Sequence, residues 1–155
     1  MDMKGFVVPP GQAPVLEMSK TGRSVALMLQ SEATAESVLM FEETAPAGTT
    51  TGVHIHHDSD EVMYVLSGEI TCKIGDQVTV GGPGTCAFIP RSVAHAWKNT
   101  GSETARMLFT YTPAGAGKWF EEQSRSGRTV ASMDDPERAE FFRRHGWERV
   151  GPSPF

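Results

Sequence analysis

Short runs of alternating apolar and polar residues fill the middle of the chain, and turns rich in glycine separate them. In residues 70–74, Ile70, Cys72 and Ile74 alternate with other side chains, which is the pattern of a half-buried strand. Gly75-Asp76 then indicates a hairpin into residues 77–80. Short strands at near-regular spacing predict an all-β, antiparallel sandwich or barrel. The other expected strands cover residues 25–30, 37–43, 61–67, 85–89, 95–99 and 105–112.

The last third of the chain has a different pattern, which predicts two short helices. The first is expected over residues 118–123. The second begins with Asp135 as N-cap and Pro136 in the first helical position, runs to about His145, and ends at Gly146. We therefore expect a single domain over residues 1–155, with a barrel core at about 24–112 and a C-terminal extension at about 113–155. That extension could act as a stabilising clamp, a lid over a pocket or a dimer contact.

The charge and the apolar content of the chain restrict the classes of binding partner that we expect. The 155 residues carry a formal net charge of −5. Between Ser24 and Cys72 there is no lysine or arginine, but there are many carboxylates, which argues against nucleic acid or an anionic membrane as partner. We see no apolar run long enough to span a membrane and no secretory signal. Cys72 and Cys86 are expected to pack as small apolar residues, so we expect a cytoplasmic protein.

The first motif that carries chemistry reads Gly48-x5-His54-x-His56-x4-Glu61-x6-Gly68. Side chains on a strand alternate between faces, so His54 and His56 point the same way. Glu61 follows a short turn and can approach the same point from a neighbouring strand. The pattern therefore predicts three ligands around one ion.

The second motif reads Gly84-x5-Pro90-x-Ser92-x2-His95-x3-Asn99 and adds a fourth ligand, His95, from a later strand. Imidazole nitrogens with one carboxylate suit iron, manganese, cobalt, nickel, copper or zinc, whereas calcium and magnesium prefer shells made of oxygen. The expected cofactor is therefore one divalent transition metal ion.

Two further histidines are expected to lie outside this site. His57 should face away from His56 as an exposed neighbour. His145 lies near the end of the second expected helix, where a cation interacts favourably with the helix dipole.

The two motifs resemble those of the cupin superfamily. The first matches at all five defining positions, and the second matches at four, with Ser92 where the family usually has glycine. The resemblance implies one cupin barrel, a double-stranded β-helix or jelly roll, in which the positions of His54, His56, Glu61 and His95 bind the metal. Glycine adopts a positive φ more readily than serine, so the turn before His95 is in question. Single-unit cupins often pair through sheet edges, and the resemblance therefore implies a homodimer.

A second resemblance, to single-domain bacterial cupins of the quercetin-dioxygenase-like kind, lies in residues 112–115 and 119–122 and in the tail. It implies a metal-dependent dioxygenase acting on a small aromatic or enol-type substrate, with Glu61 as a general base. A metal-dependent lyase or isomerase and a non-catalytic ligand-binding module remain alternatives.

Strand alternation also predicts the walls of the substrate pocket. If Glu61 points inward, so does Met63, and if His95 points inward, so does Trp97. Phe88 and Met40 are added on weaker grounds. An apolar pocket with an aromatic ring favours an aromatic substrate over a free sugar.

Overall fold

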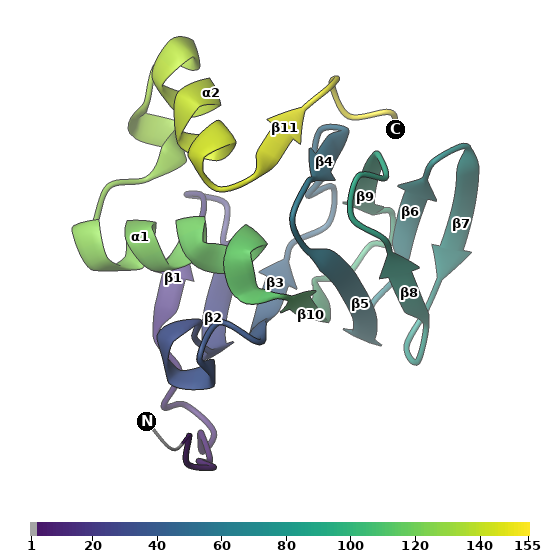
Figure 1. Cartoon of the computed structure of the whole chain (residues 1–155). Helices are drawn as coiled ribbons and strands as arrows, with labels where there is room; N and C mark the ends of the chain where they lie inside the picture. The colour runs from purple at the N-terminus through teal and green to yellow at the C-terminus, as the bar shows by residue number, and fades with distance from the viewer. Residues whose placement is uncertain (1–2) are drawn as a thin grey trace.

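Within residues 3–155, which the computed structural model describes, eleven strands form two antiparallel sheets that enclose one hydrophobic core (Figure 1). The strands are β1 (Val15–Glu17), β2 (Ser24–Leu29), β3 (Leu39–Ala45), β4 (His54–His56), β5 (Asp60–Ser67), β6 (Ile70–Ile74), β7 (Gln77–Gly81), β8 (Cys86–Ile89), β9 (His95–Asn99), β10 (Ala105–Thr112) and β11 (Trp147–Arg149). The first sheet has the order β1-β2-β3-β10-β5-β8 and the second β11-β4-β9-β6-β7. This arrangement confirms the predicted all-β jelly roll.

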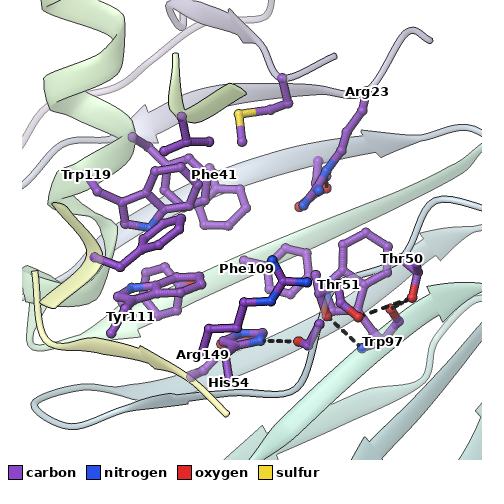
Figure 2. A pocket seen from close by; sticks show the side chains of 18 of the residues that line it. Arg23, Phe41, Thr50, Thr51, His54, Trp97, Phe109, Tyr111, Trp119 and Arg149 are labelled. Atoms are coloured by element: carbon purple, nitrogen blue, oxygen red, sulfur yellow. Dashed lines mark hydrogen bonds and ion pairs between the residues drawn. The ribbon is translucent and has the colours of Figure 1, made fainter. Parts of the chain in front are cut away.

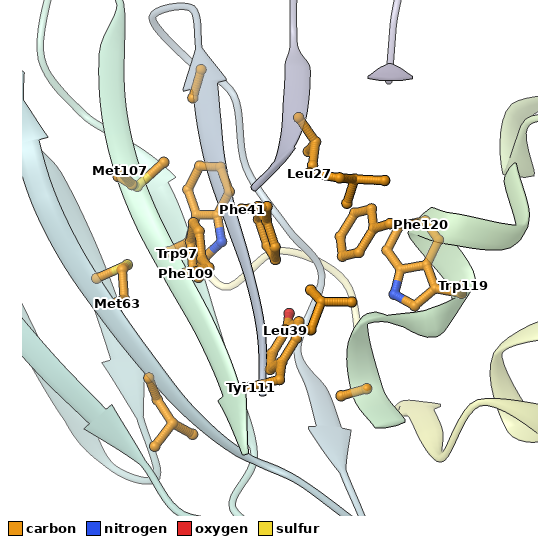
Figure 3. Packing of buried hydrophobic residues seen from close by; sticks show 14 of the residues in the cluster. Leu27, Leu39, Phe41, Met63, Trp97, Met107, Phe109, Tyr111, Trp119 and Phe120 are labelled. Atoms are coloured by element: carbon orange, nitrogen blue, oxygen red, sulfur yellow. The ribbon is translucent and has the colours of Figure 1, made fainter. Parts of the chain in front are cut away.

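Aromatic side chains join the two sheets in the core (Figure 3). Alternation along β3 buries Phe41, and alternation along β10 buries Phe109 opposite it. Their rings stack with centroids 5.0 Å apart. Trp97 reaches the same cluster from β9 in the other sheet, with its ring centroid 6.1 Å from that of Phe109. These contacts fix the distance between the sheets beside the strands that carry the two motifs.

The C-terminal segment contains the two predicted helices, α1 (Lys118–Ser126) and α2 (Asp135–Arg144). The N-cap of α2 is Asp134, one residue before the predicted Asp135, and its side chain accepts a 2.9 Å hydrogen bond from the Glu137 amide. Gly146 follows the C-cap with a φ of 73°, in the role expected for it. Three short 3₁₀ turns complete the fold: η1 (Glu32–Thr34), η2 (Ala114–Gly117) and η3 (Val130–Ser132).

After α2 the chain returns to the barrel and adds β11 to the edge of the second sheet (Figure 1). This strand pairs with β4 and sets Trp147 opposite His56 and Arg149 opposite His54. The sequence pattern did not predict β11, nor the equally short β1. Among the helices of residues 3–155, none is both long and apolar enough to cross a membrane.

Candidate metal centre

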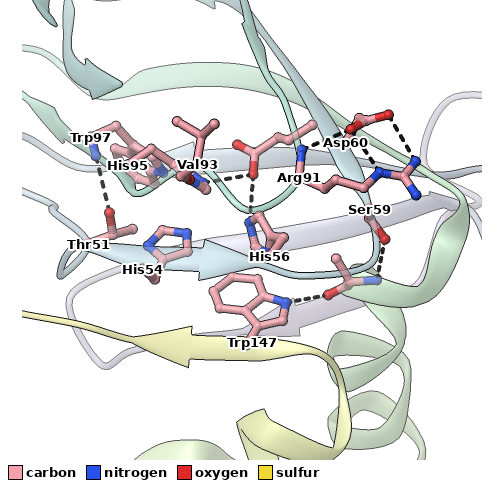
Figure 4. Close-up of polar contacts among 12 residues, drawn as sticks. Thr51, His54, His56, Ser59, Asp60, Arg91, Val93, His95, Trp97 and Trp147 are labelled. Carbon is pink, nitrogen blue, oxygen red and sulfur yellow. Dashed lines mark hydrogen bonds and ion pairs between the residues drawn. The ribbon is translucent and has the colours of Figure 1, made fainter. Parts of the chain in front are cut away.

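The structure brings the four predicted ligands together (Figure 4). His54 and His56 lie on β4, Glu61 on β5 and His95 on β9. Because β4 pairs with β9 at His54 and His95, these two rings meet from adjacent strands. All four side chains are buried, and one ligand atom from each lies within 4.8 Å of the others. The cluster therefore has the compactness that a single ion requires.

Backbone carbonyls orient two of the histidine rings. The Nδ1 of His54 lies 2.8 Å from the Gly52 carbonyl oxygen, and the Nδ1 of His95 lies 2.9 Å from that of Val93. A carbonyl oxygen only accepts, so each Nδ1 carries the proton and donates it. The Nε2 of His54 then keeps its lone pair for an ion, whereas the Nε2 of His95 would give up the proton that it shares with Glu61 when an ion binds. A carbonyl oxygen on Nδ1 is the outer-shell arrangement found around metal-binding histidines.

The carboxylate of Glu61 lies between the rings of His56 and His95. Its Oε2 is 2.8 Å from the Nε2 of His56 and 3.2 Å from the Nε2 of His95. Burial favours the neutral acid, but the attraction of His95 and the hydrogen bonds from His56 and His95 outweigh it. Together they hold the pKa of Glu61 well below its usual value, so its carboxylate is ionised at neutral pH.

The other members of the cluster differ in their protonation. Burial, together with the nearby His95 and His56, lowers the pKa of His54 to about 3, so His54 is neutral at pH 7. For His95, burial lowers the pKa, but the Glu61 carboxylate more than offsets this and raises it above its usual value. Metals bind neutral imidazole and ionised carboxylate. Three imidazoles and one carboxylate thus fit a divalent transition metal ion.

Ser92 adopts the conformation for which the family uses glycine. Its φ is 66°, and its amide donates a 2.7 Å hydrogen bond to the carbonyl oxygen of His56. The turn before His95 therefore keeps its geometry, and the serine costs about 1–2 kcal/mol of backbone strain instead. The substitution does not displace a ligand.

A cavity of about 330 Å³ opens beside His54 and Glu61 (Figure 2). It lies between the barrel and the C-terminal segment, and both contribute aromatic side chains to its wall. The aromatic lining residues are Phe41, Trp97, Phe109 and Tyr111 from the barrel and Trp119, Phe120, Phe142 and Trp147 from the C-terminal segment.

The four predicted pocket residues have different positions. Trp97 lines the cavity and is only 4% exposed. Met63 points inward as expected but packs in the core instead of lining the cavity wall. The predictions for Phe88 and Met40 are wrong, since Phe88 is 59% exposed and Met40 lies on the outer face of β3. In both strands the side chains that face inward are those of the neighbouring residues, such as Phe41.

The sequence did not indicate two aromatic residues beside the centre. The Trp147 ring stacks on His54, with centroids 4.7 Å apart and planes 2° from parallel, and meets His56 edge-on at 4.1 Å. Its Nε1 donates a 2.8 Å hydrogen bond to the Ala116 carbonyl oxygen, which fixes the ring (Figure 4). Tyr111 also meets His56 edge-on, with ring centroids 5.1 Å apart. For Trp147, the only sequence signal was its position directly after Gly146, the glycine that ends the predicted helix.

The remaining histidines and the cysteines lie outside the cluster. His57 is exposed and pairs with Glu148 at 2.8 Å, and His145 follows α2 as its C-cap. Both cysteines are free thiols. Cys72 is buried, as expected, and burial raises the pKa of its thiol. Cys86 is exposed on β8, which corrects the expectation that it packs inside.

Comparison with known proteins agrees with this geometry. Residues 40–111 match Cupin_2, the cupin domain family. Residues 40–111, which carry both motifs, therefore form a cupin domain. This cupin is 31% identical over 102 residues, 66% of the chain, to the HTH-type transcriptional regulator PuuR of Escherichia coli K12. The chain spans only 55% of that relative's length.

Solved structures share the fold of this cupin. A predicted oxalate decarboxylase from Thermotoga maritima superposes with a TM-score of 0.64 at 23% identity, covering 70% of this chain and 99% of that one. The protein TT1209 from Thermus thermophilus has a TM-score of 0.56 at 26% identity, covering 64% of this chain and 90% of the other. Each match covers the other protein more completely than it covers this chain.

Proposed function

We propose that this cupin is a metal-dependent enzyme, a dioxygenase acting on a small aromatic or enol-type substrate. The observation that carries the proposal is the position of the four-residue cluster, whose members His54 and Glu61 face an aromatic cavity. At about 330 Å³, the cavity is in the size range of small-molecule sites. An aromatic wall beside a candidate metal centre favours a flat, apolar substrate that carries an oxygen for the ion.

An iron, manganese, nickel, cobalt, copper or zinc ion would be held by His54, His56, Glu61 and His95, and it would supply Lewis acidity and, for a redox-active metal, dioxygen chemistry. Glu61 would accept the proton of a substrate hydroxyl. The pKa of the substrate hydroxyl is lower when its oxygen binds a metal ion, and an enol or a phenol gives up its proton more readily than an alkyl alcohol.

The aromatic wall would position the substrate. Trp97 and Phe109 offer ring faces on the barrel side of the cavity, and Trp147 is already stacked against His54 on the other side. Aromatic pairs gain about 0.5–1.5 kcal/mol beyond the burial of their area. A planar substrate held this way also excludes water from Glu61.

An oxygen-independent lyase or isomerase is a second candidate, and Tyr111 favours it. Tyr111 lines the cavity, and no other residue within 3–155 forms a hydrogen bond with its hydroxyl. Burial, with the nearby carboxylates of Glu61 and Glu43, raises the pKa of Tyr111 well above its usual value. The hydroxyl therefore stays protonated and could donate a proton to a carbanion or enolate.

A non-catalytic ligand-binding module is a third candidate, favoured by the likeness to PuuR, which is a transcriptional regulator. The same cavity would then bind a ligand without turning it over.

One experiment separates the three candidates. The protein is purified without chelators, its metal content is measured, and oxygen consumption is screened on phenols and diketones. The dioxygenase proposal predicts turnover that consumes oxygen and stops when the metal is removed. Turnover that continues without oxygen indicates the lyase or isomerase, and saturable binding without turnover indicates the binding module.

We also propose that the protein is a homodimer that pairs through a sheet edge. β8 is the last strand of the first sheet, and its outer face carries Phe88, which is 59% exposed. Tyr64, which lies opposite Cys86 on the neighbouring β5, is 40% exposed. An exposed edge with apolar side chains requires covering. Sedimentation at micromolar concentration should show a dimer, and a monomer alone would contradict the proposal.

A further inference from the structure

Three arginines line the cavity, and two of them already have partners. Arg23 donates to Glu43 at 2.5 Å and lies 5.4 Å from the centre of the Trp97 ring. Arg138 donates to backbone carbonyls of η3 and its C-cap and to Asp135. Within residues 3–155, the guanidinium of Arg149 has neither an ion pair nor a hydrogen bond. It is thus the cation of this cavity that is available to a ligand.

The position of Arg149 relates it to the candidate metal centre. The pairing of β11 with β4 sets Arg149 directly opposite His54, and opposed residues of an antiparallel pair share one face of the sheet. Figure 2 shows the side chain passing over His54 toward Phe109 and Thr51. The guanidinium therefore lies along the cavity and close to the cluster, although the residue is exposed to solvent.

Gly52 makes room for this guanidinium. A Cβ atom at position 52 would lie 2.8 Å from the Nε of Arg149 and 2.8 Å from the backbone carbonyl oxygen of Gly151, both closer than real Cβ contacts allow. The carbonyl of the same glycine orients His54. One residue therefore serves both the candidate metal ligand and the placement of the arginine.

We propose that Arg149 is an anion-binding subsite, and that the substrate is a planar aromatic or enolic compound carrying both a hydroxyl and a carboxylate. This inference rests on the proposed function, because it places the hydroxyl beside Glu61 and the ring between the aromatic walls. The flat fork of an arginine binds a carboxylate through two parallel hydrogen bonds. The substrate carboxylate would lie at the mouth of the cavity, which fixes the orientation of the ring.

Two probes that differ only in charge test the subsite. Salicylate and salicylamide have the same ring and the same ortho hydroxyl, but only salicylate carries a carboxylate. Their affinities are measured by titration calorimetry on the cobalt(II)-loaded protein. We expect salicylate to bind about tenfold more tightly than salicylamide. Arg149→Gln should remove roughly this tenfold preference and leave salicylamide binding unchanged.

Two further variants serve as controls. Arg143→Gln removes the same charge from the same C-terminal segment, but Arg143 pairs with Glu140 on α2 and is 72% exposed away from the cavity. It should leave both affinities unchanged. Arg149→Lys keeps the charge without the fork, so it should retain part of the preference for salicylate. Melting temperature and cobalt content establish that each variant is folded and loaded.

The outcomes distinguish this inference from the proposed function. Equal affinities for the two probes in the wild type, or an unchanged salicylate affinity in Arg149→Gln, overturn the subsite alone. Loss of both probes in Arg149→Gln also overturns it, because it gives Arg149 a structural role. If neither probe binds the loaded wild type, the proposal of an aromatic substrate fails, and the subsite fails with it.

Discussion

The barrel and the C-terminal segment contribute different chemistry to one cavity. The barrel strands β4, β5 and β9 carry all four candidate metal ligands, which are held by ladder pairing and backbone carbonyls. The C-terminal segment adds none of these four. It contributes aromatic faces such as Trp147 and the cation Arg149, whose guanidinium has no partner among residues 3–155.

This division explains where specificity would arise. The match to the cupin domain family ends at residue 111, before any of the C-terminal lining residues. The four residues that could hold an ion thus lie inside the family region, and residues that would select a ligand lie partly outside it. The extension was predicted to be a clamp, a lid or a dimer contact, and in the structure its residues Trp147 and Arg149 form part of the cavity wall.

The largest effect should follow from removing a candidate ligand on the barrel side. His54→Ala and His95→Ala each delete one of four ligands, and we expect at least about a hundredfold loss of metal affinity, since even outer-shell changes cost 10–100-fold. Metal content after desalting, measured by mass spectrometry, checks this. His57→Ala is the control and should keep its metal. Equal losses in the His57 and His54 variants would show that the cluster is misassigned.

On the C-terminal side, Trp147→Ala should lower stability while leaving metal binding in place. It removes the stack on His54 and the hydrogen bond to Ala116, and it should cost about 3 kcal/mol of unfolding free energy. Urea denaturation measures this cost, and metal content should stay near wild type. Trp147→Phe, which keeps an aromatic face, should cost less. A loss of metal as complete as in His54→Ala would remove the distinction between the two regions.

Acid should destabilise the metal-free barrel through His54. Its pKa is about 3 in the folded protein against 6.5 for the free side chain, so between these values the unfolded chain binds more protons. Stability should therefore fall as pH drops from about 6.5 to 3, at up to about 1.4 kcal/mol per pH unit from this residue. His95 has the opposite sign, because its raised pKa gives stability below pH 6.5 that is lost as pH rises through the raised value.

Denaturation of the metal-free protein at several pH values measures this slope. His54→Gln should flatten it, since glutamine does not titrate. An unchanged slope in that variant would assign the acid sensitivity to other groups.

The smallest effect concerns the turn before His95. Ser92→Gly should raise the unfolding free energy by about 1 kcal/mol, because glycine adopts a φ of 66° without the strain that serine carries. Ser92→Ala, which keeps a Cβ, should show no such gain in a urea titration. Equal stability of the glycine and alanine variants would mean that this turn is not strained.

The sequence predicted the barrel better than the cavity, for physical reasons. Alternation and glycine turns are local signals, so they located most barrel strands and the face shared by His54 and His56. Phe88 and Met40 were placed inside because a shift of one residue reverses the face of a strand, and the register depends on partners distant in sequence. The N-cap of α2 differed by one residue, which is the usual uncertainty at helix ends.

Local sequence signals could not predict the part of the cavity wall that the C-terminal segment forms. β11 has three residues, too few to show a period of two, and its place beside β4 depends on the path of the chain after α2. Trp147 and Arg149 therefore became site residues only through tertiary contacts. Their single sequence signal was their position just after Gly146.

X-ray absorption spectroscopy of the protein loaded with zinc tests the assignment of the metal centre most directly. We predict a first shell of three imidazole nitrogens and a carboxylate oxygen, at about 2.0–2.2 Å. The His95→Ala variant should show one imidazole fewer in whatever zinc it retains. A wild-type shell with one imidazole or none would contradict the assignment of His54, His56, Glu61 and His95 as the metal centre.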